Sequence, residues 1–90
     1  MLSQQNLRLI GILGFRMEEG ETLAELMHRI DVSDRQDIKE QTGFIPIYEA
    51  LLYSDREMTE EDIALTERIN TALKGLVKKA RPVYGLIHNT

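Results

Sequence analysis

The chain contains no cysteine and no tryptophan, and it has only two prolines. The absence of cysteine excludes disulfides, thiol catalysis and thiolate metal sites, and it fits a reducing compartment. No apolar run approaches the roughly 20 residues that a membrane-spanning helix needs. The apolar segment 7–15 is short and lacks the small-residue cleavage site of a signal peptide. We therefore expect a cytoplasmic protein with no membrane partner.

Motifs that carry catalysis or bind cofactors are also missing. The chain has no glycine-rich dinucleotide or phosphate loop, no nucleophile elbow and no metal-spaced cluster of ligands. Its two histidines, His28 and His88, lie far apart and outside any ligand motif. Carboxylate pairs such as Glu60 with Glu61 stand in polar segments, whereas general acid catalysis needs a buried carboxyl with a perturbed pKa. The sequence therefore predicts a protein that is not an enzyme and needs no metal or cofactor.

The overall composition is typical of one soluble globular domain spanning residues 1–90. Hydrophobic residues make up 42% of the 90 residues and charged residues 29%, which suits a folded chain rather than a disordered one. A domain of this size is only marginally stable on its own. Oligomerisation would therefore be a natural supplement to its small core.

The net charge of −4 is unevenly distributed along the chain. Residues 1–58 carry six basic and eleven acidic side chains, whereas residues 59–90 carry five basic and four acidic ones. No acidic residue follows Glu67. This asymmetry has two interpretations: an acidic body with a basic end could steer a charged partner, or the charges could complement the dipole of a helix.

Residues 21–43 predict two short helices joined by a tight turn. Thr22 with Glu25 and Ser33 with Gln36 each fit a capping box. Each helix is expected to have about eight residues, with the turn near 31–33, and Gly43 is expected to end the second in a left-handed conformation. The apolar residues expected in the core here are Leu23, Leu26, Met27, Ile30 and Ile38, flanked by Val32 and Phe44.

Residues 59–81 predict the longest helix. Thr59 with Asp62 fits a third capping box, acidic residues follow at the start, basic residues stand at the end, and Pro82 stops the helix before the tail 82–90. A helix of about 22 residues extends roughly 33 Å. Its apolar stripe either packs the short helices or forms part of a homo-oligomer interface, with a dimer favoured. The stripe consists of Leu65, Ile69, Leu73, Leu76 and Ala80.

Two further segments complete the predicted fold. Segment 3–17 places Leu7, Ile10, Leu13 and Met17 on one helical face. After a break at 43–46, Pro46 can occupy the first turn of a short helix over 47–53. Together, the segments predict an all-α fold, a compact bundle of four to five helices.

One structural alternative stays open at this point. Gly11 and Gly14 weaken a helix in the N-terminal segment. Segment 7–15 could instead be a buried strand that pairs with a strand at 83–88. The alternative fold is a small α+β domain.

The stretch from Thr22 to Ser33, with Leu23, Leu26 and Ile30 on one face, resembles the helix-turn-helix of bacterial and phage regulators. The order of such a corner followed by a long C-terminal helix is also similar to small phage-type regulators that oligomerise through that helix. This resemblance implies a transcription regulator that binds DNA through its second helix. The residues expected to face DNA are Arg35, Gln36 and Lys39, with Lys78, Lys79 and Arg81 assisting at the phosphates.

Acidic residues on the expected recognition helix favour a second hypothesis. Asp34, Asp37 and Glu40 would face a polyanion, whereas neutralising phosphates supplies most of the nonspecific affinity for DNA. The rival function is an acidic adaptor or inhibitor that binds a basic protein and not DNA. Its expected surface consists of Tyr53, Asp55, Glu57, Met58, Glu60 and Glu61.

Overall fold

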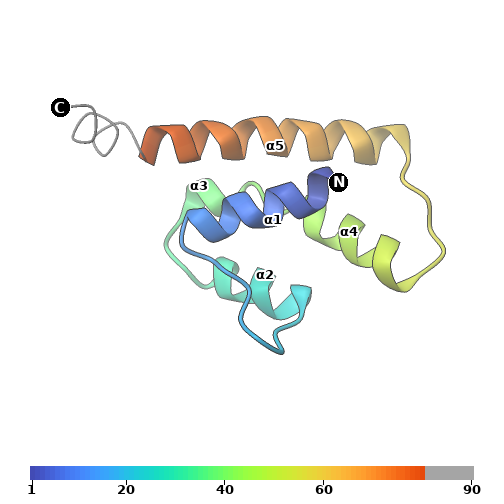
Figure 1. Ribbon diagram of the computed structural model, residues 1–90, viewed down its shortest axis with the longest axis horizontal. Helices are drawn as coiled ribbons and strands as arrows, with labels where there is room; N and C mark the ends of the chain where they lie inside the picture. The colour runs from blue at the N-terminus through green and yellow to red at the C-terminus, as the bar shows by residue number, and fades with distance from the viewer. Residues whose placement is uncertain (81–90) are drawn as a thin grey trace.

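The amphipathic periods of the sequence produce five helices in the computed structural model, which describes residues 1–80 (Figure 1). No strand occurs within this part of the chain. The prediction of an all-α bundle with a long C-terminal helix is therefore confirmed, and the strand alternative for 7–15 is wrong. Its expected partner strand at 83–88 lies outside the described residues. The helices are α1 (Leu2–Ile12), α2 (Leu23–Asp31), α3 (Gln36–Lys39), α4 (Phe44–Tyr53) and α5 (Glu60–Ala80).

Helix α1 is shorter than the predicted segment 3–17, because the chain turns away after Ile12. The Leu13 N–H donates to the Leu9 carbonyl at 3.1 Å, and Gly14 then adopts a φ of +117°. Glycine reaches this left-handed region without the steric cost that a Cβ would impose. Met17 consequently lies in the connection to α2, where it is 37% exposed, and not on a helical face.

Helix α5 begins as the sequence predicts. The Thr59 N–H donates to the Asp62 carboxylate and the Asp62 N–H donates to the Thr59 hydroxyl, both at 3.1 Å. This reciprocal pair is the predicted capping box, which satisfies two backbone donors that have no partner within the helix. Pro82, the predicted stop, lies outside the described residues.

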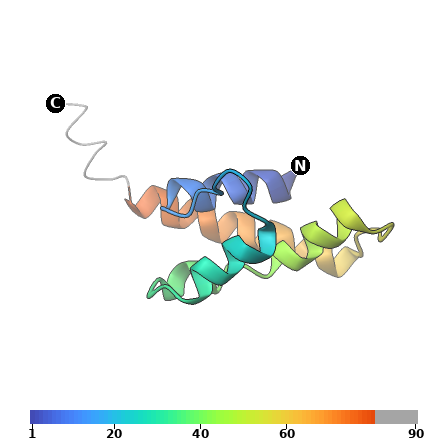
Figure 2. The same cartoon turned by 90° about the horizontal axis from the view of Figure 1, so that it is seen from below.

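Helix α1 lies along α5 (Figures 1 and 2), and the centre of their contact is polar. The Asn70 side-chain amide donates to the side-chain oxygens of Asn6 at 2.9 Å and of Gln5 at 2.8 Å. The Asn6 amide donates in turn to the Thr66 carbonyl at 3.3 Å. Buried amides need such partners, because an unpaired amide in the interior is costly. Asn6 and Asn70, which are 64 residues apart in the chain, therefore tie α1 and α5 together.

Helix α2 has the predicted start. The Glu25 N–H donates to the Thr22 hydroxyl at 3.1 Å, and the Thr22 N–H donates to the Glu25 carboxylate at 3.4 Å. The second predicted capping box, at Ser33 and Gln36, is wrong. The Ser33 hydroxyl instead donates back to the Ile30 carbonyl at 2.6 Å and accepts the Arg35 N–H at 3.3 Å. Ser33 thus serves the end of α2 and the turn, and it does not start α3.

The chain between α3 and α4 is more helical than predicted. Gly43 has a φ of −60° and leads directly into α4, so the expected left-handed stop is wrong. Pro46 falls in the first turn of α4, where its missing N–H would have had no intrahelical acceptor in any case. Helix α4 therefore starts at Phe44, upstream of the predicted start at residue 47.

One apolar cluster holds the five helices together. The predicted core residues of the α2–α3 corner are buried, except that Met27 is half-buried and Val32 is 70% exposed, so its expected flanking role is wrong. Burying each large aliphatic side chain stabilises the fold by roughly 1.5–3 kcal/mol. The buried cluster consists of Ile10, Leu13, Leu23, Leu26, Ile30, Ile38, Phe44, Ile45, Tyr48, Ile69 and Leu73.

The apolar stripe of α5 belongs largely to this core. Ile69 and Leu73 are 3% and 0% exposed, and Leu65 and Leu76 are partly buried against them. Of the stripe, only Ala80 is exposed. Four residues of the stripe, Leu65, Ile69, Leu73 and Leu76, therefore pack against the domain's own helices, which was the alternative interpretation. Ile69 and Leu73 are thus not accessible to a second copy of the chain.

Candidate functional site

The residues predicted to contact DNA gather at one end of the molecule, where α3 lies near the last turns of α5 (Figures 1 and 2). Lys78 and Lys79 are exposed in the last turn of α5. Gln36 is exposed on α3 and Lys39 is half-buried there. Arg81 lies outside the described residues. The fold thus places the two helices that carry these residues, α3 and the last turns of α5, at the same end of the molecule.

Arg35 is already engaged within the protein. Its guanidinium donates two hydrogen bonds to the Asp37 carboxylate, from Nε and Nη2, both at 3.2 Å. This bonding raises the pKa of Arg35 and lowers the pKa of Asp37. Reading a guanine edge requires the same two-pronged donor. Arg35 would therefore have to leave Asp37 before it could read a base.

Helix α3 is much shorter than the recognition helix that the sequence predicts. It has four residues, little more than one turn, against an expected length of about eight. Ile38 is its one buried residue, and the exposed acids Asp34 and Glu40 flank it. A helix of one turn presents few side chains to a groove, and here acidic neighbours surround them.

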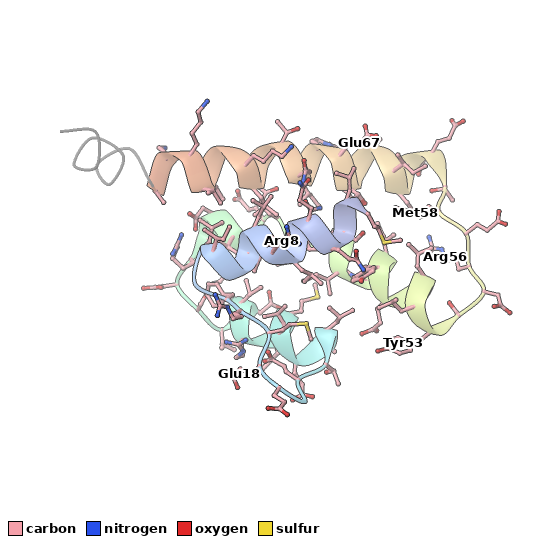
Figure 3. The ribbon with its side chains drawn as sticks, in the orientation of Figure 1. Arg8, Glu18, Tyr53, Arg56, Met58 and Glu67 are labelled. Atoms are coloured by element: carbon pink, nitrogen blue, oxygen red, sulfur yellow. The ribbon has the colours of Figure 1, made fainter. Side chains whose placement is uncertain are left out.

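The surface predicted for a protein partner lies at the other end, where residues 54–59 connect α4 to α5 (Figures 1 and 3). Tyr53 is 80% exposed at the end of α4. Four carboxylates are exposed on the connection and at the start of α5, and none forms an ion pair or side-chain hydrogen bond within residues 1–80. They are Asp55, Glu57, Glu60 and Glu61.

Asp62, by contrast, has a structural role. It accepts the Thr59 N–H in the capping box and a hydrogen bond from Arg56 Nη2 at 3.2 Å. The backbone hydrogen bond from Thr59, with a smaller contribution from Arg56, lowers the pKa of Asp62. This pairing uses the one cation of the connection, so the four carboxylates around it keep their charge uncompensated within the described residues.

An apolar groove of about 150 Å³ opens between the start of α1 and the start of α5, and Met58, in its lining, belongs to the same connection as Asp55 and Glu57. We call it the Met58 groove. Figure 3 shows Met58 beneath the first turn of α5, where it reaches toward the N-terminal end of α1. Ser3 also borders this groove, and its buried hydroxyl has no hydrogen-bond partner among the described residues. The lining residues are Met1, Leu2, Ser3, Met58, Ile63 and Thr66.

A second groove, of about 330 Å³, lies between the start of α2 and helix α4. We call it the Tyr53 groove, because Tyr53 stands at its edge with Leu23, Pro46 and Ala50 beside it. Glu49 adds a carboxylate to its wall. Tyr53 and Met58, the two predicted surface residues without a charge, therefore each border a separate groove.

Sequence reasoning missed the other apolar residues of this end. Ile63 and Leu52 are 43% and 52% exposed. Ile63 lies in the predicted long helix but outside its apolar stripe, and that offset was the available signal. Met1 and Leu2 reach the Met58 groove only because α1 packs against α5. Such a contact between the two ends of the chain leaves no local pattern.

The described residues form no group of three or more histidine, cysteine, aspartate or glutamate side chains placed to hold a metal ion. Of the helices within residues 1–80, none has both the length and the apolar character to cross a membrane. Comparison of the chain with protein-family models, with curated proteins and with solved structures finds no significant match.

Proposed function

We propose that this domain is a non-enzymatic protein-binding module, and that its partner supplies a basic, amphipathic segment. The observation that carries the proposal is the Met58 groove, an apolar surface lined by the connection that also carries Asp55 and Glu57, whose carboxylates form no ion pair within the described residues. We define the α4–α5 surface as Leu52, Tyr53, Asp55, Glu57, Met58 and Ile63, with Glu60 and Glu61 adjoining it.

The chemistry of this surface selects the kind of partner. Met58 and Ile63 offer an apolar wall, and methionine adapts its shape to different apolar side chains. The carboxylates of Asp55 and Glu57 attract lysine and arginine, and they disfavour acidic partners and nucleic acid. A helix or extended segment with apolar anchors and flanking cations would satisfy both.

DNA binding by the helix-turn-helix corner is the second candidate. The resemblance of residues 22–33 favours it, as does the position of α3, which carries Lys39, near the last turn of α5, which carries Lys78 and Lys79. The single turn of α3 and the pairing of Arg35 with Asp37 weigh against it. We therefore place protein binding first.

Backbone amide shifts measured by nuclear magnetic resonance test the first proposal. The probe is an amphipathic helical peptide of leucine and lysine, titrated into the labelled protein. The shifts should concentrate over residues 52–63, and Met58→Ala should weaken binding about tenfold, which corresponds to about 1.4 kcal/mol. Met17→Ala is the matched control, since Met17 is also accessible but lies in the α1–α2 connection.

The charge requirement has its own pair of variants. Asp55→Lys combined with Glu57→Lys should abolish binding of the peptide, whereas Asp31→Lys with Asp34→Lys, at the far end of the domain, should leave it unchanged. A leucine–glutamate peptide should not bind. Shifts that map away from residues 52–63, or equal binding of the two peptides, would refute the proposal.

The DNA hypothesis is tested with a fluorescent duplex of random sequence. It predicts affinity that falls steeply with salt and drops in the variants Lys39→Ala and Lys78→Ala. If the anisotropy of the duplex does not change at low salt, DNA binding is excluded.

A further inference from the structure

The side of α5 that faces away from the domain carries a charge pattern of its own, which shares only Glu60 and Glu61 with the residues that adjoin the α4–α5 surface. Helices α1, α3 and α4 all lie on one side of α5, and no other described element covers the opposite side (Figure 1). We call this opposite side the outer face of α5. Its exposed residues are Glu60, Glu61, Ala64, Glu67, Arg68, Thr71, Lys74, Gly75, Lys78 and Lys79.

Charge changes sign along the outer face. Every exposed acid of α5 precedes every exposed base, and the change occurs between Glu67 and Arg68. The helix dipole favours this order only within the first and last turns. Glu67 and Lys74 lie in the middle turns of a 21-residue helix, so the dipole does not explain them. At 3.6 residues per turn, Glu60, Glu67 and Lys74 fall on one stripe with Lys78.

Gly75 is a second unexplained feature of this face. A Cβ at position 75 would meet no atom within 4 Å, and the residue has no positive φ. Neither crowding within the domain nor backbone conformation therefore requires glycine, which weakens the interior of a helix relative to alanine. A small residue here leaves room for something that approaches from outside the domain.

We propose that the outer face of α5 binds a second copy of the same face, antiparallel, across a two-fold axis. Reversing the helix places the acidic half of one copy against the basic half of the other, so the surface is complementary to itself. That is the property a two-fold interface requires. With Ala64 opposite the partner's Gly75, Glu60 faces the partner's Lys79 and Glu61 faces the partner's Lys78.

This interface differs from the one that the sequence predicts. The predicted stripe, including Ile69 and Leu73, is buried in the domain, and the outer face lies on the opposite side of the same helix. A single pair of helices gives an interface at the small end of the range for stable dimers. Exposed ion pairs are also screened by salt. The dimer should therefore form at high protein concentration and dissociate as salt is added.

Charge-swapped variants provide the test, with the mass measured by sedimentation at low salt. The first variant combines Glu60→Lys with Glu61→Lys, which makes both ends of the outer face basic. The second combines Lys78→Glu with Lys79→Glu, which makes both ends acidic. Each variant alone should be a monomer under conditions where the natural chain is a dimer. An equimolar mixture should restore the dimer, because the two changed faces complement each other.

Circular dichroism checks that both variants remain folded, since each reverses charges that suit the helix dipole. Gly75→Gln is an independent variant that keeps those charges. Glutamine favours a helix, so this variant should raise the Tm of the monomer, yet its side chain should cause loss of the dimer. A natural chain that stays monomeric, a mixture that stays monomeric, or a Gly75→Gln variant that dimerises unchanged would each overturn the proposal. None of these variants alters the residues used to test peptide binding.

Discussion

Helices α1 and α2 have similar lengths, but they bury different chemistry. Helix α2 buries Leu23, Leu26 and Ile30, whereas α1 buries Ser3 and Asn6 together with Ile10. The α2 contacts are non-directional, so any well-filled apolar space would hold this helix. The contacts of α1 with α5 include hydrogen bonds, which are directional and specify one register. The molecule thus combines a helix held by apolar packing with one held in a defined register.

The largest effect expected from this comparison is in α2. Leu26→Ala should lower the free energy of unfolding by about 2–5 kcal/mol, because Leu26 is fully buried and its truncation leaves a cavity. A domain of this size has a total stability of about 5–13 kcal/mol, so this loss is a large fraction of the total. Urea denaturation followed by circular dichroism measures the change.

Val32→Ala is the matched control, since Val32 ends the same helix but is 70% exposed. It should change the stability by less than about 0.5 kcal/mol. If the two variants lose the same stability, apolar packing is not what holds α2.

The next effect concerns the polar contact. Asn70→Ala removes the donor to Asn6 and Gln5 and leaves the buried Asn6 oxygen without that partner. We expect a loss of about 1–3 kcal/mol, most of it from the unsatisfied group. Thr71→Ala, at the exposed neighbouring position, should change the stability far less.

Replacing both partners sharpens this prediction. Asn6→Leu combined with Asn70→Leu should be nearly neutral in stability, because no buried polar group is then left unpaired. A double variant as unstable as Asn70→Ala would mean that the hydrogen bonds themselves stabilise the fold, beyond specifying its register. The urea midpoints of the single and double variants decide between the two.

The same contrast explains what could be predicted from the sequence. Leu23, Leu26 and Ile30 repeat with a helical period, and the capping boxes at Thr22 and Thr59 are local motifs, so these elements were predictable. Asn6 and Asn70 resemble surface residues until the contact between the ends of the chain is known. Ser33 matched a capping box by spacing alone, but its hydroxyl accepts the Arg35 N–H and donates to the Ile30 carbonyl. Competition between local partners does not show in a motif.

The candidate site also combines residues that the local sequence indicates with residues that only the packing of the helices brings in. Tyr53 and Met58 stand beside the acidic residues Asp55 and Glu57 in the sequence, and that signal is local. The groove that Met58 borders also needs Met1 and Leu2, which come from the opposite end of the chain. Its shape could therefore be found only from the packing of α1 on α5.

A smaller effect comes from the hydroxyl that caps α2. Thr22→Ala should lower the stability by about 1 kcal/mol, because the Glu25 N–H loses its side-chain acceptor. Thr71→Ala again serves as the control, because its hydroxyl bonds only within the exposed face of α5. Equal losses in the two variants would contradict a specific capping role for Thr22.

The smallest effect has the opposite sign and concerns the buried hydroxyl of α1. Ser3 is 1% exposed, and its Oγ has no hydrogen-bond partner among the described residues. Ser3→Ala should therefore raise the free energy of unfolding by about 0.5–1 kcal/mol, since it removes an unsatisfied group and alanine favours a helix. Gln4→Ala, at an exposed position of the same helix, separates helix propensity from burial. If Ser3→Ala instead lowers the stability, the hydroxyl has a partner in solution. In that case neither α1 nor α2 buries a polar group that lacks a hydrogen-bond partner. The two helices then differ only in the kind of contact that holds them.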